Sequence, residues 1–170
     1  MAKKPDALRQ AQGTPALEIL AKAGVPVTIH EYDHTAKDHF GDETVAALGV
    51  PAERVFKTLL ASVVGGPKPE LVVGVVPVSG QLDLKALAAA VGGKRADMAD
   101  PALAQRSSGY VVGGISPLGQ RTRLRTVVDA SAMTYGTVLV SGGRRGLTLE
   151  LAPAELVRLT DAIVAPIGRS

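Results

Sequence analysis

The sequence predicts a single α/β domain in which helices flank a curved, mixed and largely antiparallel sheet. Helical and strand patterns are interspersed along the 170 residues, and several strands follow one another across short turns rather than across helices. A chain of this length that is 46% hydrophobic is long enough for one domain with a sizeable core. No repeat or internal boundary divides it. We therefore expect a flexible, polar N-terminal tail over residues 1–13 and one domain over residues 14–170.

Five helices are expected, because each segment begins at a residue that favours helix N-termini. These residues are Thr14, Asp42, Asp83, Asp100 and Pro153, and the threonine and Asp100 are each followed by proline. Glycines end several of the segments. The expected helices cover residues 15–23, 43–48, 84–91, 101–105 and 153–164.

Strands are expected where apolar residues alternate or run together between turn residues. The run from Val55 to Val64 and the apolar run from Leu71 to Val78 are joined by the turn GGPKP, which indicates a hairpin. The other expected strands cover residues 27–32, 94–98, 122–129, 137–143 and 147–151.

Composition excludes several kinds of site. The chain has no cysteine, so it can form no disulfide, thiolate metal site or cysteine nucleophile. Aromatic residues make up 3%, too few for a surface that stacks several bases. The net charge of +3 and the pI of about 9.3 permit a phosphate or nucleic-acid partner without requiring one. No apolar run resembles a signal peptide or a membrane span, so we expect a cytoplasmic protein without a membrane partner.

Lys57 is the first candidate site residue. Counting by two along its strand places it on the same, more apolar face as Val55, Leu59 and Ala61. A buried ammonium costs several kcal/mol unless it is paired or near water. The lysine therefore either guards a strand edge or lines a pocket, where it could hold a carbonyl oxygen, a phosphate or a ribose hydroxyl. Thr58 points to the opposite face if the strand is regular.

Two glycine-rich segments are further candidates. Gly113 and Gly114 begin the stretch GGISPLG, in which exposed backbone N–H groups could bind an oxyanion, although a wide turn explains it equally. Ser141 ends a strand beside two more glycines. It could act as a nucleophile or hydrogen-bond a substrate, but most such serines are turn residues.

Charged and aromatic residues add weaker signals. Arginine at every second position places Arg121, Arg123 and Arg125 on one face of a strand. Such a face could bind phosphates, or it could simply be exposed to solvent. Three histidines between residues 30 and 39 have irregular spacing, and we expect no metal site. Tyr32 and Phe40 flank the same loop and either fill the core or form the wall of a small pocket.

Together these motifs resemble the YbaK family of aminoacyl-tRNA deacylases, within the larger superfamily of prolyl-tRNA-synthetase editing domains. The matching segments are TPALEILAKAGVPVTIHEYDH, HFGDETVAALGV, VFKTLLA, MAD, GYVVGGISPLGQ and VSGGRRGLTLELAP, in this order from residue 14 to residue 153. The resemblance covers most of the chain.

The resemblance implies a fold and a set of site residues. It implies the fold of the editing domains and a hydrolase that removes cysteine from tRNA(Pro), with some activity on Cys-tRNA(Cys), beside prolyl-tRNA synthetase. It implies that Lys57 is essential and that no cofactor is needed. The family's GxxxPxG loop matches Gly113, Pro117 and Gly119. The positions that this resemblance assigns to the pocket are Tyr32, Phe40, Thr58, Ile115 and Ser141.

The family is associated with attack by the substrate's own thiol, which would form a cysteine thiolactone and release the tRNA. The enzyme would then supply position and charge, with the N–H of Gly113 or Gly114 facing the oxyanion and Lys57 holding the ribose, a phosphate or the carbonyl. Three alternatives stay open. They are a deacylase for Ala- or Ser-tRNA that uses water, a non-catalytic module that binds tRNA or a synthetase, and a hydrolase built on Ser141 and Lys57.

Overall fold

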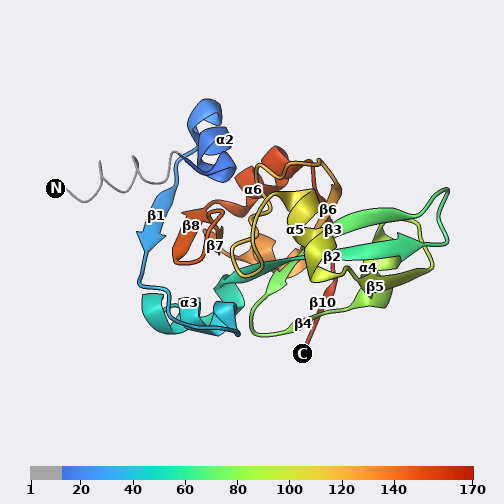
Figure 1. Ribbon diagram of the computed structural model, residues 1–170, viewed down its shortest axis with the longest axis horizontal. Helices are drawn as coiled ribbons and strands as arrows, with labels where there is room; N and C mark the ends of the chain where they lie inside the picture. Colours follow the sequence, from blue (N-terminus) through green and yellow to red (C-terminus); the bar gives the residue numbers. More distant parts are fainter. Residues whose placement is uncertain (1–12) are drawn as a thin grey trace.

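Two main sheets and five α-helices make up residues 13–170, the part of the chain that the computed structural model describes (Figure 1). The expected N-terminal tail, apart from Gly13, lies outside the described residues. The three-stranded sheet lies towards one end of the molecule, and the hairpin of β2 and β3 extends towards the other. The predicted mixed α/β fold is confirmed.

The larger sheet has five strands in the order β5-β2-β3-β6-β9. Its centre is the predicted hairpin, in which Phe56 pairs with Pro77 and Val63 with Glu70. β5 is antiparallel to β2, whereas β6 lies parallel to β3 and β9 parallel to β6. The strand bounds are Phe56–Val64 (β2), Glu70–Pro77 (β3), Arg95–Met98 (β5), Arg125–Asp129 (β6) and Ile163–Ala165 (β9).

The smaller sheet is antiparallel in the order β1-β8-β7. β10 and β4 form a separate pair. The buried carboxylate of Asp129 anchors the approach to β10 by accepting the backbone N–H groups of Ile167 and Gly168, each at 2.8 Å. The bounds are Thr28–Glu31 (β1), Gln81–Leu82 (β4), Val138–Ser141 (β7), Leu147–Leu151 (β8) and Gly168–Arg169 (β10).

The helices confirm some predicted caps and correct others. The Thr14 hydroxyl accepts the N–H of Leu17, and the Asp83 carboxylate accepts that of Ala86. Asp42 is not a cap, because that helix begins at Phe40 after His39 in the left-handed region. The last helix ends at Thr160, where Asp161 turns left-handed and the chain enters β9. The bounds are Pro15–Ala23 (α2), Phe40–Leu48 (α3), Leu84–Ala90 (α4), Pro101–Ser108 (α5) and Pro153–Thr160 (α6).

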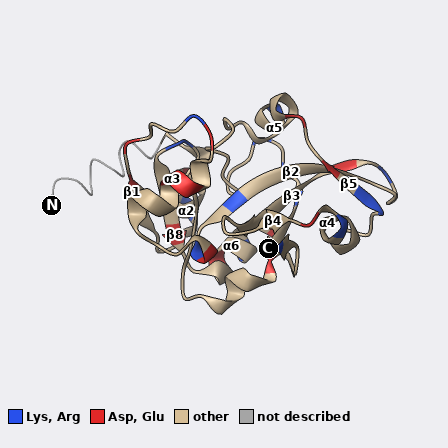
Figure 2. Ribbon diagram, turned by 90° about the horizontal axis from the view of Figure 1, so that it is seen from below, with Lys and Arg blue, Asp and Glu red and all other residues tan. Residues whose placement is uncertain are grey.

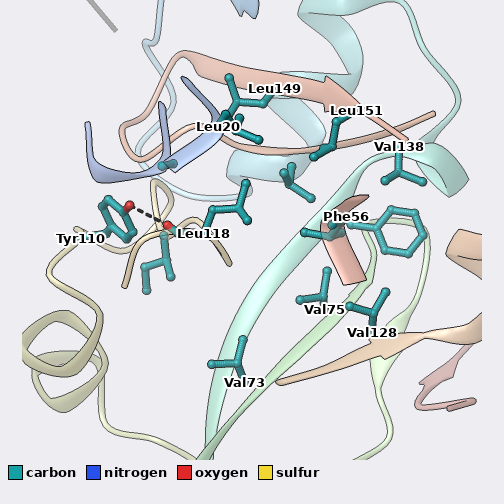
Figure 3. Close-up of a cluster of buried hydrophobic side chains, with 14 of the residues drawn as sticks. Leu20, Phe56, Val73, Val75, Tyr110, Leu118, Val128, Val138, Leu149 and Leu151 are labelled. Atoms are coloured by element: carbon teal, nitrogen blue, oxygen red, sulfur yellow. Dashed lines mark hydrogen bonds between the residues drawn. The ribbon is translucent and has the colours of Figure 1, made fainter. Parts of the chain in front are cut away.

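Both faces of the five-stranded sheet are buried, which gives the domain two hydrophobic clusters. Phe56 and Val73 face the first cluster, together with α2 and the small sheet (Figure 3). Leu60 and α6 also contribute to this cluster. Ala61 and Val63 face the second, which α4 covers. Burial on both faces explains why these strands are nearly continuous apolar runs. No helix within residues 13–170 is long and apolar enough to cross a membrane.

Candidate active site

The main cavity of the described chain has a volume of about 620 Å³ and lies where β2 loses one of its two neighbours. β3 pairs with β2 along its length, but β5 begins to pair only at Ala61. The backbone N–H and C=O groups of successive strand residues point alternately towards the two edges of the strand. The Leu60 carbonyl accepts the Ala99 N–H, so Leu60 and every second residue from it point towards the β5 side. The backbone N–H and C=O of Thr58 therefore face the open edge, which lies in the cavity.

The open edge explains why Lys57 and Thr58 both line one cavity although they lie on opposite faces of a regular strand. A solvent-filled space beside a paired strand would reach one face only. Here the space wraps around the unpaired edge and reaches side chains on both faces. The site therefore needs no irregularity in β2.

Lys57 is half-buried and lines the cavity from the middle of the sheet. Its ammonium forms no hydrogen bond or ion pair with any residue between 13 and 170. In Figure 2, β2 is tan except for one blue segment, and Lys57 is the only Lys or Arg in that strand. A cation in this position is free to bind an anionic or electron-rich group that enters the cavity.

Thr58 lines the same cavity, and its hydroxyl is buried. The side-chain oxygen has no hydrogen-bond partner within the described residues, and the residue is only 9% exposed. A buried hydroxyl without a partner costs free energy. A substrate that displaces the neighbouring atoms could supply the missing partner.

The glycine loop contributes Gly113 and Ile115 to the cavity wall. Gly113 has a φ of 88°, and a Cβ there would lie 2.6 Å from Cδ2 of Phe40, so glycine is required. Its N–H has no hydrogen-bond partner among residues 13–170 and can donate to a ligand.

Gly114, in contrast, does not supply the oxyanion N–H that we considered for it. Its N–H already donates to the Val111 carbonyl at 2.8 Å, and the residue does not line the cavity. A Cβ at this position would lie 2.8 Å from the Cα of Arg144. Gly114 therefore allows the glycine loop to pack against the turn that contains this arginine.

Pro117 and Gly119 also lie away from the cavity. Both line a smaller pocket of about 210 Å³, and a Cβ on Gly119 would lie 2.7 Å from the carbonyl carbon of Pro15. The Tyr110 hydroxyl donates to the Leu118 carbonyl at 2.7 Å, and burial raises the pKa of Tyr110 to about 12 (Figure 3). The second half of the motif thus anchors the loop to the core, whereas Gly113 and Ile115 face the cavity.

Tyr32 and Phe40 form part of the wall on the α3 side. The Tyr32 hydroxyl and the Thr44 hydroxyl are 2.5 Å apart, which ties the chain after β1 to α3. Glu43 fixes the intervening loop by accepting from His34 and from the N–H groups of Thr35 and Ala36. These hydrogen bonds lower the pKa of Glu43 to about 2.

Ser141 lines the cavity at the end of β7 but lacks the partners of a serine nucleophile. Its hydroxyl oxygen accepts the N–H of Gly143 at 3.2 Å, and no His, Asp or Lys side chain within the described residues hydrogen-bonds to it. Nucleophilic serines require an adjacent base. The geometry suits a substrate-binding hydroxyl.

The arginine stripe proposed from alternation is wrong. Residues 121–124 precede β6 as an irregular segment, and Arg125 is ion-paired with Glu70.

The histidines do not converge either. His30 pairs with Glu150 at 2.8 Å and His34 with Glu43 at 2.7 Å. Residues 13–170 contain no group of three or more His, Cys, Asp or Glu side chains that could hold a metal ion.

Several cavity residues had no recognisable signal in the sequence. Ser79, Gly80 and Gln81 line the cavity, from the turn after β3 to the first residue of the short strand β4. β4 exists because it pairs with β10, about 85 residues later, which a local pattern cannot indicate. Met98 also lines the cavity and is 50% exposed, although an isolated exposed methionine carries no specific signal.

Comparison with known proteins identifies the family. The model of the aminoacyl-tRNA editing domain matches residues 36–159. A protein from Enterococcus faecalis, named as the Cys-tRNA(Pro)/Cys-tRNA(Cys) deacylase EbsC, is 37% identical over 168 residues, which are 98% of each chain.

Two solved structures share the fold. One, described as a trans-editing enzyme for prolyl tRNA synthetase, is 27% identical with a TM-score of 0.76 and covers 96% of this chain and 98% of its own. The other, the hypothetical protein APE2540, is 25% identical with a TM-score of 0.80 and covers 91% of this chain and 99% of its own. Because the family model matches most of the chain and a relative is 37% identical over nearly its whole length, the chain belongs to the aminoacyl-tRNA editing domain family.

Proposed function

We propose that this protein is a cytoplasmic deacylase that hydrolyses the ester of cysteine wrongly attached to tRNA(Pro), and also acts on Cys-tRNA(Cys). Membership of the editing domain family and the name of the relative from Enterococcus faecalis support this assignment. The observation that carries it is the position of Lys57, a cation with no ion pair in the described chain, in a cavity beside the unpartnered Thr58 hydroxyl and the free Gly113 N–H.

The cavity suits the aminoacylated end of a tRNA rather than the tRNA body. Sites for small ligands have volumes of roughly 300–1,000 Å³, and the volume here is about 620 Å³. The cysteinyl group and its terminal ribose can therefore enter, while the rest of the tRNA lies outside. We place the carbonyl oxygen at the N–H of Gly113, and the ribose and thiol near Lys57.

The chemistry that suits this site is attack by the thiol of the substrate. Within residues 13–170 no serine that lines the cavity hydrogen-bonds to a side chain that could act as a base, and the sequence contains no cysteine. The substrate sulfur loses its proton and bonds to its own carbonyl carbon. The bond from that carbon to the ribose oxygen then breaks, and the ribose oxygen takes up a proton. Water afterwards opens the thiolactone to free cysteine.

In this mechanism the protein stabilises charge instead of forming a covalent intermediate. The N–H of Gly113 would donate to the carbonyl oxygen as it becomes negative. Lys57 would favour the thiolate and hold the ribose, and the hydroxyls of Thr58 and Ser141 would fix the substrate's polar groups. The cavity distinguishes amino acids by size only weakly, so discrimination against serine and alanine comes from their lack of a thiol.

Deacylation of Cys-tRNA(Pro), Ser-tRNA(Pro) and Ala-tRNA(Pro) at equal protein concentration tests the proposal. We expect rapid loss of cysteine only, and no loss of S-methylcysteine from the same tRNA because its sulfur is blocked. Comparable loss of serine or alanine would show that water is the nucleophile. Binding of all the substrates without turnover would contradict the enzymatic proposal and identify a binding module.

Selection of the tRNA is proposed to depend on prolyl-tRNA synthetase, because a cavity of about 620 Å³ accommodates the aminoacylated end and not the tRNA body. The structural relative described as a trans-editing enzyme for that synthetase supports such a partnership. Co-purification of the two proteins, with and without tRNA(Pro), measures it directly. Equal deacylation of Cys-tRNA(Pro) and Cys-tRNA(Cys) by the isolated protein is the expected companion result.

A further inference from the structure

We propose that Arg145 binds the 5′-phosphate of the terminal nucleotide of the aminoacyl-tRNA. This inference rests on the proposed function, because it assigns a contact to the same substrate in the same cavity. It concerns a residue that does not line the cavity itself but contacts Phe40 and Val112, which do, and these contacts define the rim meant below.

Arg145 is exposed but held in place by two contacts. Its guanidinium carbon lies 4.4 Å from the centroid of the Phe40 ring, and its Nε–H donates to the Val112 carbonyl at 2.8 Å. Stacking and one hydrogen bond fix the plane of the guanidinium without using its terminal NH₂ groups. Those groups form the two-pronged donor that suits a phosphate.

The positive charge of Arg145 has no acidic partner within residues 13–170. Glu43, on the adjacent α3, is occupied by His34 and two backbone N–H groups. The neighbouring Arg144 does form an ion pair, with Glu31 at 3.6 Å. An ordered arginine that remains unpaired beside a cavity is available for an anion.

The position of the turn matches the geometry of the substrate. Gly114 packs against the backbone of Arg144 and Arg145, with contacts of 2.8–2.9 Å to an added Cβ. The guanidinium is therefore fixed relative to the adjacent Gly113, where we place the reacting carbonyl. In a terminal nucleotide only the ribose separates the esterified oxygen from the 5′-phosphate. A substrate with its carbonyl at Gly113 can direct its phosphate towards this rim.

Two non-hydrolysable analogues test the contact without depending on turnover. They are the 3′-cysteinylamino analogues of 3′-deoxyadenosine, with and without a 5′-phosphate, and their dissociation constants are measured by calorimetry. We expect the phosphate to tighten binding to the wild-type protein roughly tenfold, as a charge-assisted hydrogen bond does. Arg145→Met should lose this gain but bind the phosphate-free analogue like wild type. Arg145→Lys should keep part of the gain.

Arg121→Met is the matched control, because Arg121 is also exposed, has no ion pair among residues 13–170 and lines neither pocket. It should keep the full gain from the phosphate. The salt dependence of tRNA binding gives a second readout, since losing one phosphate contact should reduce the slope of log K against log salt by about 0.7.

The outcomes separate this proposal from the proposed function. An equal loss of affinity for both analogues in Arg145→Met would mean that the arginine only supports Phe40 and the glycine loop, and would overturn the phosphate contact. A phosphate that adds no affinity to the wild-type protein would overturn it too. Failure of the wild-type protein to deacylate any Cys-tRNA would instead refute the proposed function, whatever the analogues show.

Discussion

Gly113 and Phe40 are in such close contact that a single added methyl group would lie 2.6 Å from Cδ2 of the ring. The glycine also has a φ of 88°, which disfavours any other residue. This contact joins the glycine loop to the first residue of α3, so two walls of the cavity fix each other's position.

Gly113→Ala should therefore reduce both stability and deacylation. Backbone strain of this kind costs about 1–3 kcal/mol, and displacement of the loop would also move the N–H proposed for the oxyanion. Urea unfolding and initial deacylation rates measure the two effects. Gly136→Ala is the control, because a Cβ there meets nothing within 4 Å and its φ is not positive. Equal behaviour of the two variants would contradict the structural role of Gly113.

Lys57→Ala should reduce deacylation of Cys-tRNA(Pro) by about a hundredfold or more, as expected when a preorganised charge beside the reacting group is lost. The fold should survive, because Lys57 makes no ion pair in the described chain that the substitution would break. Circular dichroism and a deacylation time course check both statements. Lys85→Ala, an exposed lysine on α4, should behave like wild type. A fully active Lys57→Ala variant would exclude the lysine from the mechanism.

Thr58→Val should separate stability from activity. Valine keeps the shape of threonine but removes a buried hydroxyl that has no partner, so the free energy of unfolding should rise by about 1 kcal/mol. Deacylation should become slower because the substrate loses a hydrogen-bonding group. Thr126→Val should instead lower the free energy of unfolding, because it removes the hydrogen bond that the Thr126 hydroxyl donates to the Leu124 carbonyl at 3.2 Å. A Thr58→Val variant that is less stable and fully active would show that the hydroxyl serves the fold alone.

Glu43→Gln should change how stability depends on pH. The pKa of Glu43 is lowered from 4.5 to about 2 in the folded state, mainly by the hydrogen bond from His34 and also by the N–H of Thr35. A lowered pKa contributes stability that is present above pH 4.5 and is lost as the pH falls towards 2.

The free energy of unfolding of wild type and Glu43→Gln, measured by urea at several pH values, gives this contribution. The wild-type protein should be the more stable one at pH 7, and the difference should shrink as the pH falls below 4.5. A constant difference down to pH 2 would mean that Glu43 has the same pKa folded and unfolded.

The sequence was most informative where structure is determined locally. Thr14 and Asp83 are side-chain caps as predicted, and the apolar runs around residues 60 and 74 form the central hairpin. β9 could not be predicted, because residues 163–165 continue a helical pattern and become a strand only by pairing with residues 127–129. Tertiary pairing outweighs local propensity at such positions.

In the candidate site, too, the locally determined features were predictable from the sequence and those that depend on distant contacts were not. Lys57 could be recognised because a charge interrupts an apolar strand, and Gly113 because it begins a cluster of glycines. The motif alone could not show that Gly119 packs against α2 and that Pro117 lines a different pocket, since the packing of Gly119 depends on contact with Pro15, about a hundred residues earlier. The unpaired edge of β2 was equally hidden, because it results from where β5 begins.

The unpaired edge of β2 has a consequence for self-association. A strand edge with free backbone groups can pair with a strand of another molecule, and proteins often prevent this with an inward-pointing lysine. Residues 57–59 form a short edge of this kind, between the bridge of Val55 to Leu139 and the hydrogen bond of Leu60 to Ala99, and Lys57 lies within it. The charge that we assign to the substrate would thus also keep two copies of the chain apart. Lys57→Ala should accordingly form intermolecular aggregates more readily than Lys85→Ala on storage at high concentration, which light scattering can measure.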